Sequence, residues 1–366
     1  MTEVTIQPGV PHAAVRVRRA RPRALLAGLA IALVTVSAIS VGIGAVRISP
    51  AQVVAITVAP AGISLPVSYD EAQAVVLRSI RMPRIVLGMI VGAALALSGA
   101  VLQGLFRNPL VDPALVGVSS GAALGAALLI VLGGPLVSTL PTPLALAALP
   151  VAAFVAALVT TASVFRIASV RGGTDVVLML LGGIAVNALV GAGIGLLAYV
   201  APDAQLRQFT FWTFGGLGGA TWASLAVVAP LCGLAAIGLM RLARPLNALL
   251  LGESEAGHLG VPVEQVKRRA IALTALAVGA AVSVSGVIGF VGLVVPHLLR
   301  LVIGPDHRAL LPGAAILGAL LVVVADLIAR TLVAPAEMPI GIVTAAVGAP
   351  CFIWLLVHTR STWGHA

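Results

Sequence analysis

Charged residues are scarce in this sequence. Asp, Glu, Lys and Arg together make up 9% of its 366 residues, whereas about a quarter of an ordinary soluble domain is charged. Hydrophobic residues make up 60%, and the mean hydropathy is +1.13. The composition excludes a water-soluble globule and leaves no room for a separate soluble catalytic domain. It predicts an all-α polytopic membrane protein.

Lysine and cysteine are almost absent as well. Lys267, the one lysine, is followed by two arginines, so the chain has no G-x-x-x-x-G-K-[S/T] loop and cannot bind ATP as P-loop proteins do. Cys232 and Cys351 lie in apolar segments without metal-type spacing, and they indicate neither a metal site nor a disulfide framework. If transport here uses ATP, another polypeptide must hydrolyse it.

Long apolar runs are what the sequence has instead. A membrane helix needs about 20 mostly apolar residues, and we place ten spans at 24–46, 85–105, 114–133, 144–165, 176–200, 222–240, 270–287, 288–303, 309–328 and 339–358. Few residues are available for the seventh and eighth spans together, so these two helices must be short or broken. Glycines at 286, 289 and 292 with Pro296 favour a break there.

The basic residues are distributed unevenly between the two sides of the membrane. With a cytosolic N-terminus, sixteen of the 22 Lys and Arg fall on the cytosolic side, as the positive-inside rule requires. We therefore predict a cytosolic tail at 1–23, a transmembrane domain at 24–358 with a cytosolic loop at 244–269, and a second cytosolic tail at 359–366. The net charge of +10 reflects this orientation, and we expect no nucleic-acid partner.

Two groups of charge lie near the outer ends of spans. Pro83, within the motif RMPR at 81–84, suits a first helical turn, so both arginines should share one face at the membrane surface. Arginine is unfavourable at a helix N-terminus, so we expect an anionic partner, either lipid phosphate or the carboxylates of a docking protein. Asp326 and Arg330, one turn apart, predict a local ion pair.

The cytosolic loop contains the stretch LGESEAGHLGV at 251–261. Its glycines predict one or two short, interrupted helices. Leu250, Leu251 and Leu259 have no obvious cover within the loop, and two interpretations stay open. Either a partner binds this apolar surface, or the loop helices fold back onto the bundle.

Two other classes of protein were weighed. The stretch GVSSG at 117–121 matches the nucleophile elbow of hydrolases, but it opens an apolar helix, and no histidine is placed to activate the serine. The spans hold almost no ionisable residues besides Asp326, which disfavours an ion-coupled secondary transporter. That transporter class remains the more distant alternative.

Several long motifs together resemble the permease subunits of type II ATP-binding-cassette (ABC) importers for heme, ferric siderophores and vitamin B12. The resemblance covers the chain from about Arg78 to the C-terminus. It rests on RMPR at 81–84, GAALALSGAVLQGLFRNPLVDPALVGVSSGAALGA at 92–126, LGESEAGHLGV at 251–261, GVIGFVGLVVPHLLR at 286–300, ADLIAR at 325–330 and EMPIGIVTAAVGAPCFIWLL at 337–356.

The resemblance implies a type II importer permease fold of about ten helices in a bacterial inner membrane. It implies a second permease subunit, most simply an identical copy, with two separate ATPase subunits that use ATP and an extracytoplasmic binding protein. It implies neither a catalytic residue nor a permanently bound cofactor or metal. The segment AQLRQFTFWTFGGLGGATW at 204–222 looks most like the heme branch. Heme is therefore the expected cargo, with a ferric siderophore or vitamin B12 as the alternative.

The resemblance also implies roles for individual residues. Arg81, Arg84 and Arg330 would receive glutamates of the binding protein. The contacts with the ATPase would come from Gly252, Glu253, Ala256, His258, Leu259 and Gly260. Asn108 and Leu110 would narrow a cytosolic gate. A second gate, a Thr-Ser pair in the vitamin B12 permease, meets Val176 and Val177 here.

Overall fold

A computed structural model describes residues 22–44, 46–170, 173–334 and 336–363, so most of the predicted N-terminal tail and the end of the C-terminal tail lie outside the described residues. Within them, ten apolar helices correspond one by one to the predicted spans. They are α1 (Pro22–Gly42), α4 (Met82–Leu105), α5 (Val118–Leu132), α7 (Thr142–Ala168), α8 (Val176–Val200), α10 (Trp222–Arg241), α13 (Val263–Ser285), α14 (Val291–Ile303), α15 (His307–Thr331) and α16 (Ile340–Trp363). The predicted all-α membrane fold is confirmed.

Shorter elements connect these helices. They are α2 (Pro50–Val58), η1 (Ala59–Ala61), α3 (Glu71–Val75), the π-helical turn η2 (Val76–Arg81), η3 (Pro113–Val116), α6 (Gly134–Val137), α9 (Asp203–Thr213), α11 (Ala243–Leu249) and α12 (Glu253–His258). A two-stranded antiparallel hairpin, β1 (Ser169–Val170) and β2 (Gly173–Thr174), joins α7 to α8, with Ser169 opposite Thr174.

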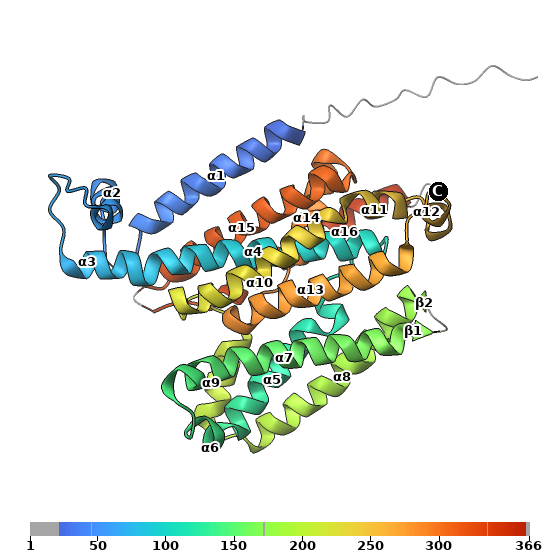
Figure 1. The fold of residues 1–366 in the computed structure, drawn as a ribbon, viewed down its shortest axis with the longest axis horizontal. Helices are drawn as coiled ribbons and strands as arrows, with labels where there is room; N and C mark the ends of the chain where they lie inside the picture. The colour runs from blue at the N-terminus through green and yellow to red at the C-terminus, as the bar shows by residue number, and fades with distance from the viewer. Residues whose placement is uncertain (1–21, 45, 171–172, 335, 364–366) are drawn as a thin grey trace, which may run out of the picture.

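The helix α4 lies at the centre of the bundle. It packs along α15 and contacts α10, α13 and α14, while α5, α7, α8 and α9 form a second group that α13 joins to the first (Figure 1). The elements α2, α3 and α9 lie at one end of the bundle, and α11, α12 and the hairpin lie at the other (Figure 1). The predicted topology puts the α11–α12 loop in the cytosol, so we call the end with α2 and α3 the outer end and the opposite end the cytosolic end.

Glycines let α4 approach its neighbours closely. A Cβ at Gly92 would lie 2.2 Å from the carbonyl oxygen of Gly318 in α15, and one at Gly99 would lie 1.9 Å from that of Gly292 in α14. Real side chains cannot fit at such distances, so these crossings require glycine, as close helix packing in membranes commonly does. By contrast, Gly191 on α8 has nothing within 4 Å of its Cβ position.

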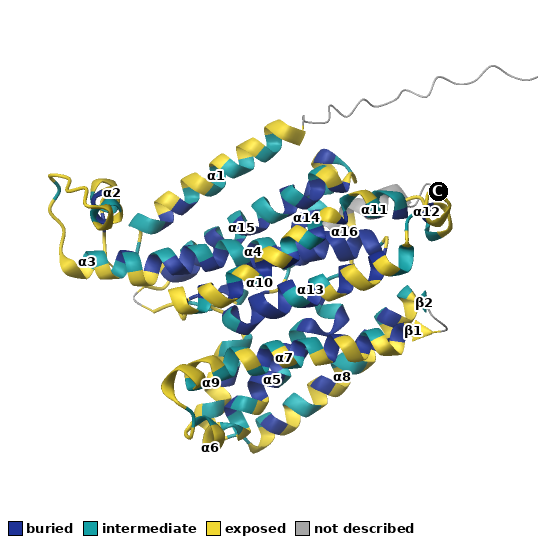
Figure 2. Cartoon of the chain, viewed as in Figure 1, coloured by how far each residue is buried: buried dark blue, intermediate teal, exposed yellow. Residues whose placement is uncertain are grey.

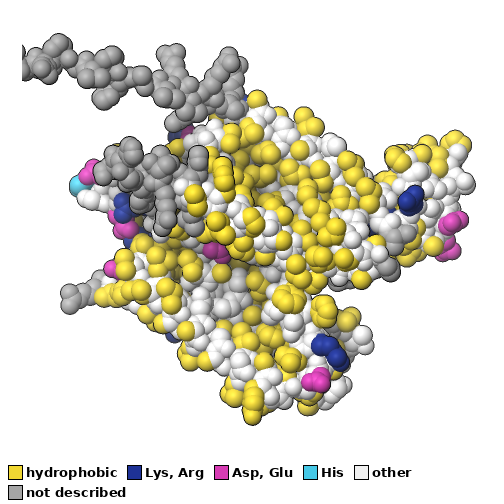
Figure 3. All heavy atoms as spheres, turned by 180° about the vertical axis from the view of Figure 1, so that it is seen from behind, with side chains coloured by type: hydrophobic (Ala, Val, Ile, Leu, Met, Phe, Trp, Pro, Cys, Tyr) yellow, Lys and Arg dark blue, Asp and Glu magenta, His cyan; other side chains and the backbone are white. Residues whose placement is uncertain are grey.

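Burial follows the arrangement expected of a membrane bundle. The middle of α4 is buried, whereas α1 and α8 expose much of their apolar surface (Figure 2). Hydrophobic side chains cover much of the face shown in Figure 3, and the charged side chains gather towards its two ends. Helices that are apolar on their exposed faces are typical of contact with lipid or with another membrane subunit.

The start of the second span differs from the prediction. Pro83 lies in the first turn of α4, as predicted, but helical structure continues without a break from Glu71 to Leu105, so this turn is not a free helix N-terminus. Proline removes one intrahelical hydrogen bond and normally clashes with the preceding turn. The π-helical turn η2 directly precedes it, and the N–H of Met82 donates to the carbonyl of Leu77, five residues back. This local widening accommodates the proline.

The predicted break between the seventh and eighth spans is confirmed. The helix α13 ends at Gly286, whose φ is 67°, and α14 begins after Phe290, whose φ is also 67°. A Cβ at Gly286 would lie 2.1 Å from the carbonyl oxygen of Trp212. Both the left-handed backbone and the close contact therefore require glycine at this position.

Candidate functional site: an outer ion cluster and a cytosolic loop

Four charged side chains meet at the outer end, and we call them the outer ion cluster: Arg84, Asp326, Arg330 and Glu337. The Nε of Arg84 donates to Oδ1 of Asp326 at 2.9 Å, and its Nη1 donates to both carboxylate oxygens of Glu337 at 2.8 and 2.9 Å. The predicted pair of Asp326 with Arg330 is confirmed, with 3.6 Å between Oδ2 and Nε. Asp326 thus faces two guanidinium groups.

A cavity of about 210 Å³ adjoins the outer ion cluster. Arg84, Asp326 and Glu337 form its charged wall, and the turn at 215–218 and the segment at 338–340 form much of the rest. A Cβ at Gly218 would lie only 3.3 Å from Oε2 of Glu337, so the bare backbone of this turn gives the carboxylate room. Arg84 is therefore the one docking candidate of the three arginines that borders this cavity.

Arg81 and Arg84, which we expected on one face at the membrane surface, are buried, and so is Arg330. Arg81, Arg84 and Arg330 are 5%, 7% and 9% exposed. Arg81 donates through Nη1 to the carbonyls of Val41 at 2.8 Å and Gly42 at 3.1 Å. These carbonyls end α1, where the backbone has no intrahelical donors left, and a cation there is favourable.

Arg330 caps the same end of α1. Its Nη1 donates to the carbonyl of Ile43 at 2.8 Å, and its Nη2 donates to Ser40. Two of the three arginines therefore hold α1 against α4 and α15. The sequence could not indicate this, because Arg330 and Ser40 are 290 residues apart.

The cytosolic loop forms two short helices, as predicted. The helix α11 ends at Leu249, and α12 runs from Glu253 to His258. Gly252 and Gly260 have φ values of 122° and 81°, a backbone that favours glycine. Ala256 is fully buried, so it fixes α12 to the rest of the chain and does not face outwards.

The loop presents apolar side chains to its surroundings. Leu250, Leu251 and Leu259 are 41%, 67% and 64% exposed, and the side chain of His258 is 77% exposed. The loop helices do fold back onto the bundle, because α11 contacts α4, α13 and α15 and α12 contacts α13, but these three leucines stay exposed. An exposed apolar patch on a cytosolic loop is typical of a protein interface.

The only lysine anchors α12. Lys267 is 5% exposed, and its Nζ donates to Oε2 of Glu253 at 2.7 Å and to the carbonyl of Thr174 at 2.8 Å. Glu264 accepts from the N–H of Thr174 at 2.8 Å and from its hydroxyl at 2.6 Å, and Arg268 donates to Glu264 at 3.0 Å. These bonds link α12, the start of α13 and the hairpin before α8.

A second anchor joins α11 to α15. The side chain of Asn247 donates to Oδ1 of Asp306 at 2.6 Å, and its Oδ1 accepts from the backbone N–H of His307 at 2.9 Å. The N–H of Arg308 and the amide of Asn247 both donate to Asp306, and these bonds hold the pKa of that carboxyl below its usual value. The side chain of Asn247 therefore ties α11 to the first turn of α15.

The predicted gate residues lie where α4 ends at the cytosolic side. Oδ1 of Asn108 accepts from the N–H of Leu110 at 2.9 Å, which shapes a tight turn, and Leu110 is 44% exposed. Val176 and Val177 begin α8 at the same end, and Val177 is 63% exposed. The two segments thus expose apolar side chains and no charge at these gate positions.

Sequence reasoning missed several residues that connect elements, among them Thr174, Asn247, Glu264 and Glu337. Glu337 opens the motif EMPIGIV, and a carboxylate beside a membrane span is itself a signal for an ion pair. The others lie in cytosolic segments with many polar residues, where no spacing distinguishes them.

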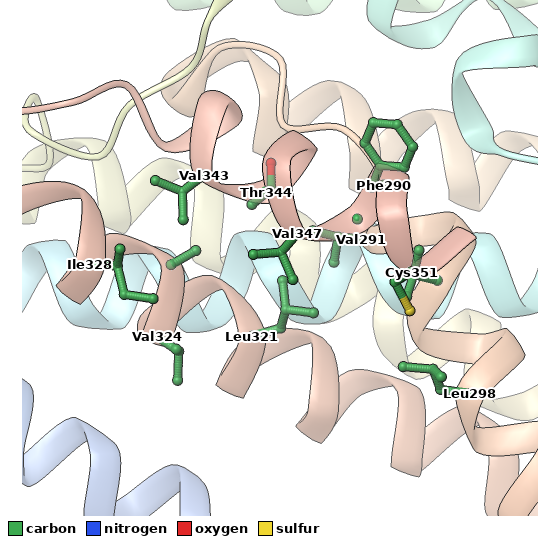
Figure 4. A pocket seen from close by; sticks show the side chains of 13 residues that line it. Phe290, Val291, Leu298, Leu321, Val324, Ile328, Val343, Thr344, Val347 and Cys351 are labelled. Carbon is green, nitrogen blue, oxygen red and sulfur yellow. The ribbon is translucent and has the colours of Figure 1, made fainter. Parts of the chain in front are cut away.

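A second cavity, of about 140 Å³, is apolar. It lies between α14, α15 and α16, and Leu321, Val324, Ile328 and Val347 are among the residues that line it (Figure 4). Thr344 on its wall donates to the carbonyl of Gly341 at 3.2 Å. This cavity offers no charge for recognition. No cluster of His, Cys, Asp or Glu within the described residues could hold a metal ion.

The chain is similar to known transport proteins along nearly its whole length. Residues 30–358 match the FecCD transport family. A hemin transport system permease of Yersinia pestis is 47% identical, over 93% of this chain and 98% of that protein. A cobalamin import permease of Halobacterium salinarum is 45% identical, over 82% of this chain and 78% of that protein.

A solved structure has the same fold. It is an inward-facing conformation of a metal-chelate type ABC transporter, 34% identical to this chain with a TM-score of 0.78. The match covers 92% of this chain and 99% of that one.

Proposed function

The chain belongs to the FecCD transport family, and we propose that it is the permease subunit of an ABC importer that brings hemin into the cytoplasm. The assignment of hemin as the cargo rests on the 47% identity to a hemin permease over nearly all of both chains. The cobalamin permease is almost as similar in identity but matches a smaller share of each chain. Vitamin B12 is therefore less favoured.

We propose that the importer contains a second copy of this chain, two ATPase subunits and an extracytoplasmic binding protein, in a bacterial inner membrane with both permease termini cytosolic. The start of α1 and the end of α16 lie at the end of the bundle that carries α11 and α12, which supports a common side for both termini (Figure 1). The sequence holds no P-loop lysine, which supports a separate ATPase.

Docking of the binding protein is proposed at the outer ion cluster. Arg84 borders the outer cavity and can pair with a carboxylate in a bidentate manner. Arg81 and Arg330 support the site from within, since they fix α1 and Asp326 beside Arg84. In this proposal, Arg84 contacts the partner directly, and the other two arginines position the surface around it.

Coupling to the ATPase is proposed at the cytosolic loop. The exposed Leu251, His258 and Leu259 would contact the ATPase, with Gly252 and Gly260 shaping the loop and Ala256 securing it. Lys267 and Asn247 would carry the movement to α13 and α15, because each bonds the loop to those helices. Such coupling by rigid elements needs two global states that the partners stabilise differently. The helices would then rock around the cytosolic gate at Asn108 and Leu110.

The proposal is tested by the ATPase activity of the assembled importer in lipid nanodiscs. The permease is combined with an ABC ATPase subunit and an extracytoplasmic binding protein from the same organism. Binding protein loaded with hemin should stimulate ATP hydrolysis more than the same protein loaded with cobalamin or left empty. Stimulation by cobalamin alone would assign the other cargo, and the absence of any stimulation would reject the ABC importer role.

The substitution Lys267→Met tests the coupling anchor in the same assay. It removes a charge-assisted bond to Glu253 and the bond to Thr174 while keeping a long apolar side chain. We expect stimulated ATPase activity to fall by about fivefold or more, the lower range of typical coupling between sites. Arg269→Gln, which removes an exposed positive charge two residues away, is the matched control and should stay near wild type. Equal activity of both variants would remove Lys267 from the coupling path.

A further inference from the structure

The Glu337 side chain occupies the position on Arg84 that a docking carboxylate needs. Building on the proposed docking function, we propose that Glu337 is an internal substitute for the binding protein's carboxylate. In the free permease, Glu337 neutralises Arg84, and docking displaces it in a carboxylate exchange. The undocked outer surface is thereby kept from binding anions strongly until a partner with a well-placed glutamate or aspartate arrives.

The charges of the outer ion cluster support an exchange. Arg84 and Arg330 contribute two positive charges, and Asp326 and Glu337 contribute two negative charges. The four charges of the cluster therefore balance in this structure, and Glu337 weakens the attraction that an incoming carboxylate would feel from Arg84. Once Glu337 turns away, the cluster has one positive charge, and a carboxylate from the partner restores neutrality.

Glu337 is the carboxylate that can leave, and Asp326 is not. The side chain of Asp326 is 3% exposed and lies between Arg84 and Arg330. The side chain of Glu337 is 53% exposed and contacts Arg84 alone among the charged residues that the structure describes. Glu337 also lies in the link between α15 and α16, where its backbone is outside any helix. Its side chain can turn to solvent without disturbing a span.

The outer cavity supplies the space for the exchange. Arg84 and Glu337 lie together on the wall of this cavity of about 210 Å³, which the glycine-rich turn at 215–218 also lines. Nη2 of Arg84 makes no hydrogen bond to any side chain or carbonyl in the described part of the chain. A carboxylate that enters the cavity could engage this free nitrogen first and then take Nη1 as Glu337 departs. The result would be a bidentate pair.

The backbone around Glu337 connects the exchange to the bundle. The N–H of Met338 donates to the carbonyl of Ala329 in α15 at 3.0 Å, and that of Ile340 donates to Gly215 at 3.1 Å. The segment therefore links α15, α16 and the turn below the cavity. Displacing the Glu337 side chain would remove one tie between α4 and this link, and it would leave the backbone bonds in place.

The experiment measures the affinity of the extracytoplasmic binding protein for the permease–ATPase complex in nanodiscs, at low and at high salt. Glu337→Gln should bind the protein about fivefold more tightly or better at low salt, because no internal carboxylate competes. Glu337→Asp keeps the charge but shortens the reach to Arg84, and it should also bind more tightly. If Glu337→Asp binds more tightly, the lost contact with Arg84 is the cause, because this variant leaves the net charge of the outer ion cluster unchanged.

Two further variants make the outcome decisive. Glu71→Gln makes the same change at an exposed outer-end position and should leave the affinity near wild type, whereas Arg84→Gln should weaken it. If the wild type binds and Glu337→Gln binds equally or more weakly, the exchange is wrong while docking stands. If the protein binds neither the wild type nor Glu337→Gln, or binds Arg84→Gln as tightly as wild type, docking at this cavity is itself refuted.

Discussion

Replacing Asp326 with Asn is expected to destabilise the permease by about 3–5 kcal/mol, the usual effect of removing one partner from a buried ion pair. Asp326 is 2% exposed, and it is the carboxylate that Arg84 and Arg330 share. Without its charge, two buried guanidinium groups face each other with only the half-exposed Glu337 to compensate. The asparagine can still accept a hydrogen bond, but it cannot neutralise either arginine.

The free energy of unfolding in detergent, measured by SDS titration, checks this expectation. Asp203→Asn is the matched control, because Asp203 is an exposed outer-end carboxylate in the first turn of α9. Its loss should cost less than about 1 kcal/mol, the range of a charge interacting with a helix dipole. Similar small losses for both variants would mean that Asp326 does not hold the outer end together.

The second large effect is expected from Gly99→Ala. The new Cβ would lie 1.9 Å from the carbonyl oxygen of Gly292, and this atom belongs to the backbone, so no side-chain rotation can relieve the contact. The helices α4 and α14 must separate, and we expect a loss of about 3 kcal/mol, at the upper end of typical overpacking costs. The same unfolding titration provides the measurement.

Gly191→Ala provides the control for Gly99→Ala. The position on α8 is open, with nothing within 4 Å of the Cβ, so the alanine should be neutral or should stabilise the helix by up to about 1 kcal/mol. If Gly99→Ala proved as stable as Gly191→Ala, the close α4–α14 crossing would not exist in the membrane.

The sequence was sufficient to locate the spans, because an apolar run of membrane length is a local property of the chain. The break between α13 and α14 could also be predicted, since Gly286 and its neighbouring glycines mark it directly. The short helices α2 and α9 were not predicted. They lie outside the apolar runs, and the start of α2 is fixed by the local Ser49–Gln52 capping box.

The site was predictable only in part. The motif identified Arg81, Arg84 and Arg330, but their burial depends on contacts with the end of α1 and with Glu337, far away in the sequence. The Asp326–Arg330 pair was predictable because both residues lie on one helix. Contacts such as Lys267 with Thr174 bring together separate cytosolic segments. No periodicity within either segment encodes such a contact.

We propose that this permease moves hemin only when partner subunits hydrolyse ATP. Proteoliposomes that contain the full importer, with a heme-binding reporter protein trapped inside, provide the most direct test through the Soret absorbance of the reporter. We expect hemin delivery with ATP and loaded binding protein, none with an ATPase that binds but cannot hydrolyse ATP, and no effect of a proton ionophore. Delivery that persists with the inactive ATPase but collapses with the ionophore would contradict it.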